Sequence, residues 1–255
     1  GVESGEWRAV IDPEGDEGWA QWAASYRKFV EAWATVAEEG EADLLSVGVE
    51  QRSWVTTRRA PLYREVLAAV RSRYRGPLTY SANWDDAEDT VIWGELDVIG
   101  INAFYPLADR EGATFEVLLE GGRRVAARVA ALGERWRRPV LFTEIGYTAR
   151  PDPAVRPWEW PDGMSNVKVD EVAQADAYAA LIAPLMDLPG FAGFFVWRFY
   201  ADPEDVSQEA EWGFSPRGKR AEQVLRQAFA LRWASDPAPL PGELPGSLLR
   251  ALFTP

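Results

Sequence analysis

The sequence of 255 residues contains no cysteine and no histidine. The missing cysteine excludes disulfides, thiolate nucleophiles and cysteine-ligated metal sites, and it leaves the redox compartment open. The missing histidine excludes a Ser-His-Asp triad, an HExxH zinc site and acid/base chemistry by imidazole. Lysine is scarce, and none of Lys28, Lys168 and Lys219 ends a predicted strand, so a Schiff base has no good candidate. Demanding chemistry is left to the carboxylates, of which there are 40.

The net charge limits the classes of molecule that the protein can bind. A net charge of −13 disfavours binding to nucleic acid or to an anionic membrane surface, because both repel an acidic protein. No apolar run reaches the ~18–20 residues that a membrane helix needs. We therefore expect no nucleic-acid and no membrane partner, whereas a neutral substrate such as an oligo- or polysaccharide would be indifferent to this charge. The opening residues GVESGEWRAV lack the features of a signal peptide, so the location stays open, with a secreted or periplasmic one preferred.

Apolar runs alternate with helical patterns along the sequence. Five runs have the character of strands buried on both faces: 44–50, 77–84, 96–104, 139–146 and 191–200. Amphipathic or helix-compatible segments surround them: 19–37, 61–74, 86–94, 114–136, 170–187 and 218–230. This alternation predicts parallel βα units. We assign residues 1–233 to this domain and residues 234–255 to a Pro-rich C-terminal tail.

Polar and aromatic residues stand where the predicted strands end. They are Glu50, Asn83 with Trp84, Asn102 to Tyr105, Glu144, and Trp197 with Arg198. The N-terminal ends of these strands carry no comparable set of polar and aromatic residues. In a (β/α)8 barrel the strand C-termini converge on the active-site face, so this asymmetry predicts a TIM barrel. A doubly wound sheet is the alternative, although it would place its ligand at a single crevice.

Two of these strand-end residues form a candidate catalytic pair. Glu50 and Glu144 lie 94 residues apart, which is three βα units of roughly 30 residues each. Retaining glycosidases hold two carboxyl groups about 5–5.5 Å apart, one as proton donor and one as nucleophile. A glutamate at a strand end can also simply face water, but both of these follow apolar runs, where an unpaired charge is costly. Tyr105 is a candidate hydrogen-bond donor to Glu144.

Thirteen tryptophans are the second feature. Trp84 and Trp197 end predicted strands, and Trp158 and Trp160 lie in the Pro-rich loop after the Glu144 strand. Indole faces stack on the C–H faces of sugar rings, and loops at a barrel rim are where such contacts form. The loop pair could equally pack the loop onto the barrel.

The order of these motifs resembles a known family. SVGVEQRSW, LTYSANW, LDVIGINAFYPL, VLFTEIGY, PWEW, GFFVWRF and WGFSPRGKRAEQVL together resemble glycoside hydrolase family 113 over roughly residues 7–230. The resemblance implies a clan A (β/α)8 barrel and retaining endo-β-1,4-mannanase activity. It also implies that Glu50 is the acid/base at the end of strand four and Glu144 the nucleophile at the end of strand seven.

The resemblance assigns further residues to the substrate. Tyr105 matches the strand-six tyrosine near the nucleophile, and Trp197 matches the tryptophan under the −1 sugar. Asn83 and Trp84 match strand-five residues that face the cleft. Val49 departs from the asparagine that many clan A enzymes carry before the acid/base, which leaves the identity of the sugar open.

A second departure concerns the barrel itself. Strands one to three have no counterpart in the sequence, and five strands cannot close a barrel. We expect either that the sequence is part of a longer chain or that a partner, such as the missing N-terminal barrel segment, supplies these strands.

The sequence thus predicts a retaining glycoside hydrolase that acts on β-1,4-mannan or a related neutral β-glycan, without metal or cofactor. Its catalytic residues are Glu50 and Glu144, and its substrate-binding candidates are Asn83, Trp84, Tyr105, Trp197 and Trp160. A non-catalytic glycan-binding protein on a degenerate or incomplete barrel is the alternative. A scaffold fragment that pairs with other barrel halves is a third interpretation.

Overall fold

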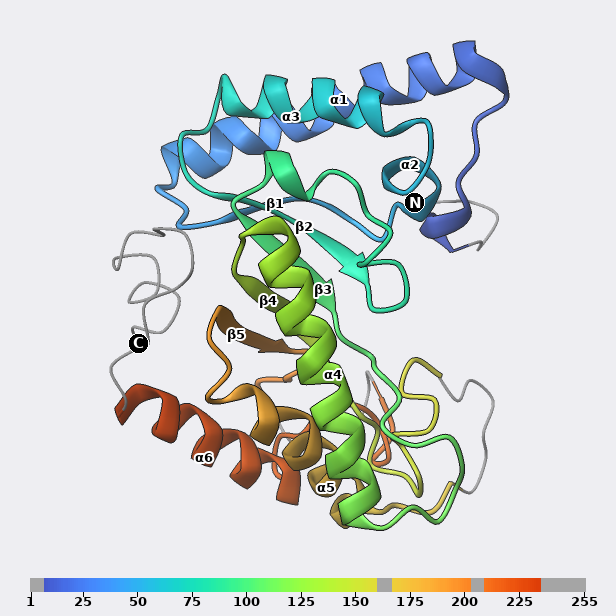
Figure 1. The fold of residues 1–255 in the computed structure, drawn as a ribbon, viewed down its shortest axis with the longest axis vertical. Helices are drawn as coiled ribbons and strands as arrows, with labels where there is room; N and C mark the ends of the chain where they lie inside the picture. Colours follow the sequence, from blue (N-terminus) through green and yellow to red (C-terminus); the bar gives the residue numbers. More distant parts are fainter. Residues whose placement is uncertain (1–6, 160–166, 203–208, 235–255) are drawn as a thin grey trace. The chain divides into compact units, whose positions relative to one another are not determined.

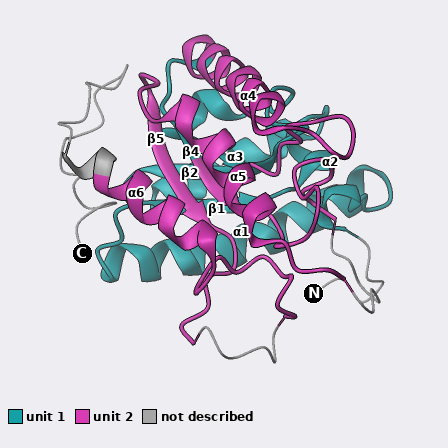
Figure 2. Cartoon of the chain, turned by 90° about the horizontal axis from the view of Figure 1, so that it is seen from below, with its two compact units in different colours: residues 1–101, 136–141, 242–255 teal, residues 102–135, 142–241 magenta. Residues whose placement is uncertain are grey.

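The computed structural model describes residues 7–159, 167–202 and 209–234 (Figure 1). The chain forms two compact units (Figure 2). Unit 1 comprises residues 1–101, 136–141 and 242–255, and unit 2 comprises residues 102–135 and 142–241. None of the described helices is long and apolar enough to span a bilayer.

The sheet has five strands, and their order follows the sequence, β1-β2-β3-β4-β5. The strands are β1 (Leu45–Val49), β2 (Leu78–Asn83), β3 (Val98–Asn102), β4 (Val140–Ile145) and β5 (Phe191–Val196). β1 and β2 run parallel, with Leu45 opposite Leu78 and Val49 opposite Ser81, and the register shifts between Ser46 and Val49. Sequential neighbours in a parallel sheet are what repeated βα units produce, so the predicted α/β class is confirmed.

Helices connect the strands. The α-helices are α1 (Gly15–Glu39), α2 (Arg52–Val55), α3 (Ala60–Arg71), α4 (Phe115–Trp136), α5 (Glu171–Ile182) and α6 (Arg220–Ala234). Three short 3-10 helices add η1 (Arg8–Val10), η2 (Trp93–Glu95) and η3 (Ala183–Leu185). In Figure 1, α1 and α3 lie side by side, as do α5 and α6, and each pair is in contact.

Unit 1 is built around an aromatic cluster beneath β1. Trp54 and Tyr63 are buried, with ring centroids 4.8 Å apart in an edge-to-face arrangement. The hydroxyls of Tyr26 and Tyr63 both donate to the Val47 carbonyl, at 2.8 and 3.0 Å. A Cβ atom on Gly48 would lie 2.2 Å from the Tyr63 hydroxyl, so β1 needs a glycine there to approach this cluster.

Unit 2 depends on another close approach. A Cβ atom on Gly122 of α4 would lie 1.9 Å from the Ala180 carbonyl oxygen of α5, so these two helix backbones can meet only at a glycine. Helix α5 begins with a side-chain cap, because the Asp170 carboxylate accepts from the Ala173 amide at 2.9 Å. Gln174 is fully buried and donates to the Tyr147 carbonyl at 2.8 Å, which ties α5 to the segment that follows β4.

The structure differs from the sequence-based expectations in three places. No α-helix forms over 86–94, where turns lead into η2. The short helix α2 was not predicted. Trp19, Phe29 and Trp33 stand at the apolar positions of the amphipathic segment predicted over 19–37, but of these three only Trp19 is buried on α1, whereas Phe29 and Trp33 are 60% and 54% exposed. The periodicity gives the direction of the apolar face, whereas burial depends on what covers it.

Candidate active site

Glu50 follows β1 directly, and its backbone is held on both sides. Its amide donates to the Ser81 carbonyl at 2.8 Å, and the next amide, of Gln51, donates to the Tyr80 hydroxyl at 2.5 Å. Glu50 adopts a φ of 49°, in the left-handed region that non-glycine residues rarely occupy. Such backbone strain is concentrated at functional sites, where the surrounding structure holds it in place.

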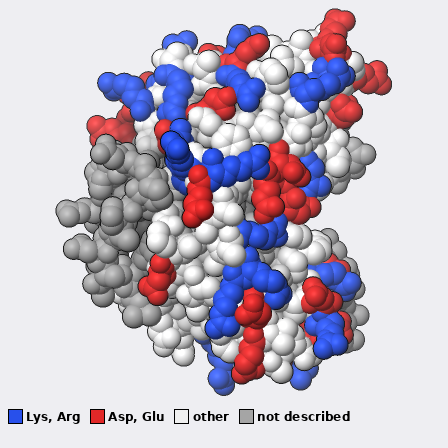
Figure 3. All heavy atoms as spheres, viewed as in Figure 1, with Lys and Arg blue, Asp and Glu red and all other residues white. Residues whose placement is uncertain are grey.

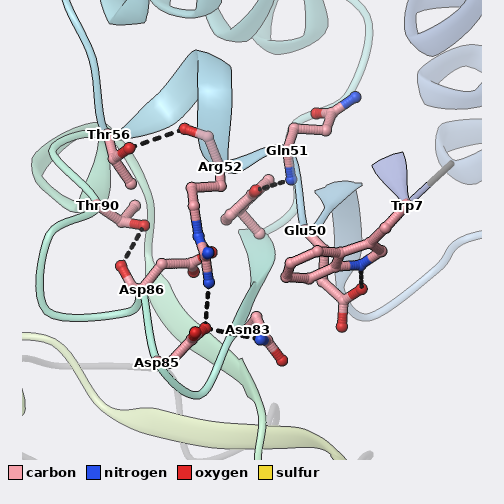
Figure 4. Close-up of polar contacts among 10 residues, drawn as sticks. Trp7, Glu50, Gln51, Arg52, Thr56, Asn83, Asp85, Asp86 and Thr90 are labelled. Atoms are coloured by element: carbon pink, nitrogen blue, oxygen red, sulfur yellow. Dashed lines mark hydrogen bonds and ion pairs between the residues drawn. The ribbon is translucent and has the colours of Figure 1, made fainter. Parts of the chain in front are cut away.

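The Glu50 carboxylate is buried and receives two donors through one oxygen. Oε2 accepts from Nε1 of Trp7 at 2.9 Å and pairs with the Arg8 guanidinium at 3.0 Å. Only 8% of the residue is exposed. Figure 4 shows the Trp7 indole beside Glu50 with its N–H aimed at the carboxylate. Neither donor could be recognised from the sequence, because both precede Glu50 by more than 40 residues and lie in no recognisable motif.

Asn83, at the end of β2, belongs to an adjoining polar network in the same unit (Figure 4). Its amide nitrogen donates to Oδ1 of Asp85 at 2.7 Å. The same oxygen pairs with the Arg52 guanidinium, whose Nε donates to Oδ2 of Asp86 at 3.0 Å. The sequence offered a signal for these acids, because DD follows the strand-end pair Asn83-Trp84 directly. Trp84 itself is half-buried.

Asp86 is the most perturbed carboxyl group of this network. It is only 3% exposed, and its Oδ1 has no hydrogen-bond partner among the described residues. Burial raises the pKa of Asp86 from 3.8 to about 6, and the neighbouring charges of Asp85 and Glu50 add to the rise. The hydrogen bond and charge of Arg52 oppose it without cancelling it.

The raised pKa of Asp86 predicts a pH-dependent stability. The folded protein keeps this proton up to about pH 6, whereas the unfolded chain releases it near 3.8, so ionised Asp86 destabilises the fold as pH rises between these values. The stability of the Asp86→Asn variant should therefore improve relative to wild type by roughly 2 kcal/mol between about pH 4 and about pH 7. Urea denaturation of both proteins across this range measures the difference.

Asp16→Asn is the control for this prediction. Asp16 is exposed, and its hydrogen bond and charge contact with Arg59 lower its pKa. A lowered carboxyl pKa gives the opposite sign: the stabilisation is present above the unfolded-state value and is lost as pH falls. Stability curves of Asp86→Asn and wild type that run parallel from pH 4 to pH 7 would show that burial does not perturb Asp86.

Glu144 occupies the corresponding position in unit 2. It is the next-to-last residue of β4 and is half-buried, and its carbonyl accepts from the Ala103 amide at 2.7 Å. The residue before it, Thr143, donates through its hydroxyl to the fully buried Asn102 at 2.8 Å. Tyr105 is buried, and the Arg128 guanidinium lies 5.1 Å from its ring centroid. The hydrogen bond from Tyr105 to Glu144 stays a prediction.

Trp197 lies beside the end of β4. Its amide donates to the Ile145 carbonyl at 2.8 Å, one residue beyond Glu144. A Cβ atom on Gly146 would lie 3.2 Å from that of Trp197 and 3.0 Å from the Phe214 ring, so Gly146 lets the two strand ends pack closely. Arg198, directly after Trp197, has a φ of 61°. Strained backbone therefore follows a second predicted site residue.

The loop after β4 presents one of its two tryptophans. Trp158 is 47% exposed. The next residue, Glu159, pairs with Arg150 at 3.3 Å and Arg156 at 2.9 Å, which braces the loop around this side chain. Trp160, the residue predicted to bind substrate, lies outside the described residues.

Acidic and basic side chains are interspersed on the face seen in Figure 3, with areas of other residues between them. Ion pairs among the described residues include Arg71 with Asp97 and Arg64 with Glu95.

Comparison with known proteins identifies the protein family of this chain. The family model of Glycoside Hydrolase Family 113 matches residues 1–219. The chain belongs to glycoside hydrolase family 113. It is therefore a glycoside hydrolase. The search of curated proteins found no match.

Solved structures agree with this family. The structure of the family 113 β-mannanase AaManA from Alicyclobacillus acidocaldarius, in complex with ManMIm, has a TM-score of 0.76 and 26% sequence identity, over 90% of this chain and 70% of that one. A second family 113 β-1,4-mannanase complex has a TM-score of 0.74 and 25% identity, over 92% and 72%. A β-glucuronidase from Faecalibacterium prausnitzii, at 17% identity and a TM-score of 0.60 over 85% and 36%, shares the fold alone.

Proposed function

We propose that this family 113 enzyme is a retaining β-1,4-mannanase with Glu50 as acid/base and Glu144 as nucleophile. The observation that carries the proposal is the family match, supported by two β-mannanase structures at 25–26% identity. The placement of the glutamates adds to it, because one directly follows β1 and the other stands next to last in β4. The C-terminal ends of parallel strands are where barrel enzymes keep their catalytic groups.

The proposed reaction is a double displacement. The Glu144 carboxylate attacks the anomeric carbon while the Glu50 carboxyl group gives its proton to the departing glycosidic oxygen, which leaves a glycosyl ester on Glu144. A water molecule then loses a proton to Glu50 and attacks the same carbon, which frees Glu144 and retains the anomeric configuration. Each glutamate ends the cycle in the state in which it began.

The donors on Glu50 suit this role. Trp7 and Arg8 both contact Oε2, which fixes the position of the Glu50 carboxyl group for proton transfer. We further propose that Asn83, Trp84, Tyr105, Trp197 and Trp160 contact the sugar, with Trp197 beneath the ring that is cleaved.

The stereochemical course of hydrolysis tests the proposal. Mannohexaose is mixed with a high concentration of the protein, and the anomeric signals of the new reducing ends are followed by proton NMR before mutarotation. We expect the β-anomer to appear first and the α-anomer to follow as the sugar equilibrates. Cellohexaose and xylohexaose under the same conditions are the comparison substrates, and we expect cleavage of the mannan series to dominate. First appearance of the α-anomer would refute the retaining mechanism, and preferred cleavage of another series would refute the substrate.

A further inference from the structure

Arg52 does not touch Glu50 in any contact described above, yet it contacts the residue that does. Its guanidinium carbon lies 5.0 Å from the centroid of the Trp7 ring, in a cation–π contact, and Nε1 of the same indole donates to Glu50. We propose that Arg52 is a positioning residue that aligns the acid/base Glu50 through the Trp7 indole. This inference rests on the proposed function, because it needs Glu50 to be the proton donor.

Two aspartates hold the Arg52 guanidinium in place from one side. Asp86 accepts from Nε at 3.0 Å, and Asp85 pairs with the terminal nitrogen Nη2. Asp86 is itself fixed, because its amide donates to the Asn83 carbonyl at 3.1 Å and its own carbonyl accepts from the Thr90 amide and hydroxyl, both at 3.1 Å. A planar guanidinium gripped by two carboxylates presents a fixed face to an aromatic ring.

The fixed guanidinium restrains a ring that is otherwise open to solvent. Trp7 is 40% exposed, so burial alone does not determine the orientation of its indole. An indole free to rotate would take its N–H away from Oε2 of Glu50, and the carboxyl group would lose one of its two named donors. A proton donor that is misaligned by a fraction of an ångström transfers its proton more slowly, although the substrate still binds.

The same network reaches a residue proposed to contact substrate. Oδ1 of Asp85 accepts from Asn83 at 2.7 Å and also pairs with Arg52 (Figure 4). Asp85 thereby fixes the Asn83 amide group, with the amide nitrogen toward Asp85 and the amide oxygen away from it. Arg52 therefore contacts both Trp7, which donates to Glu50, and Asp85, which accepts from Asn83. No motif in the sequence would reveal this connection.

The test uses substrates that differ in their need for acid catalysis. A mannoside with a 2,4-dinitrophenyl leaving group departs without a proton, whereas a mannotetraose glycosidic bond needs one. Arg52→Met should lower kcat/KM for mannotetraose by about 10- to 100-fold, mostly in kcat, and change that for 2,4-dinitrophenyl β-mannobioside by less than about threefold. Arg52→Lys, which keeps a cation over the indole, should recover part of the loss.

A double-mutant cycle locates the effect in the indole. Trp7→Phe keeps an aromatic ring for Arg52 but removes the N–H, and it should reproduce the selective loss on mannotetraose. Adding Arg52→Met to Trp7→Phe should then cost little more, because the two changes break the same connection. Arg64→Met is the matched control, since Arg64 is a half-exposed arginine of the same unit that pairs with Glu95. We expect its kinetics to equal those of wild type on both substrates.

The outcomes separate this inference from the proposed function. One outcome is that Glu50→Gln shows the leaving-group dependence while Arg52→Met lowers kcat/KM equally for both substrates. In that case Arg52 is structural, and only its positioning role is refuted. Additive losses in the double mutant would likewise refute a connection through Trp7. If Glu50→Gln itself shows no leaving-group dependence, the acid/base assignment fails and the role of Arg52 fails with it.

Discussion

Replacement of Glu144 by glutamine is expected to lower kcat on β-1,4-mannan by at least about 10³-fold. The amide matches the carboxylate in shape, so the half-buried site at the end of β4 should accept it without repacking. It cannot attack the anomeric carbon, because the nucleophile of the first displacement must be an ionised carboxylate. The loss should appear on activated and unactivated substrates alike. Residual activity within a few-fold of wild type would remove Glu144 from the mechanism.

Trapping of the intermediate makes this prediction specific to one side chain. The Glu144 carboxylate should displace fluoride ion from a 2-deoxy-2-fluoro-β-mannosyl fluoride and form a fluoro-sugar ester, which is stable because the 2-fluorine slows the second displacement. Intact-mass measurement should show one added sugar on wild type, and peptide mapping should place it on Glu144. Glu120→Gln on α4 is the control, since Glu120 is exposed and pairs only with Arg123 among the ion pairs described, and it should label like wild type. A label on any other carboxylate would contradict the assignment.

Local patterns were enough to predict the strands. Each of the five apolar runs forms a strand within a few residues of the predicted bounds, because a strand buried on both faces leaves an uninterrupted apolar signal. The helices were predicted where a strong amphipathic period exists. The segment 86–94 failed because its polar residues make turns and contacts with their own backbone, such as the Thr90 hydroxyl with the Asp86 carbonyl.

The candidate site was predictable only in part. Glu50, Asn83, Glu144 and Trp197 could be proposed because each stands at the end of an apolar run. The residues around Glu50 could not, since Trp7 and Arg8 reach it across more than 40 residues and neither has a local pattern that marks it. The raised pKa of Asp86 could not be foreseen either, because it depends on burial and on the charges of Asp85, Glu50 and Arg52 around it. Sequence position indicates which side chains share an edge of the sheet, whereas their protonation depends on packing.

Replacement of Glu50 by alanine is expected to separate the two steps of the reaction. On mannotetraose, kcat/KM should fall by about 10²- to 10⁴-fold, the usual contribution of a general acid. On 2,4-dinitrophenyl β-mannobioside the first step needs no proton, so the glycosyl enzyme should accumulate and kcat should fall because no base activates water. Added azide, which needs no base, should enter the space left by the side chain, restore kcat and yield β-mannosyl azide. Glu65→Ala on α3, an exposed glutamate, should show neither loss nor azide response.

The backbone at residue 50 adds a second measurement to the same experiment. At a φ of 49°, glutamate and alanine carry the same strain, whereas glycine carries none. Glu50→Gly should therefore respond to azide like Glu50→Ala but be more stable by about 1 kcal/mol in urea denaturation. Such a result would show that glutamate at position 50 costs stability relative to glycine. A residue kept at such a cost is expected where catalysis, and not stability, selects the side chain. Equal stabilities of Glu50→Gly and Glu50→Ala would mean that residue 50 does not keep the left-handed conformation in solution. A Glu50→Ala variant whose kcat does not respond to azide would mean that Glu50 is not the base.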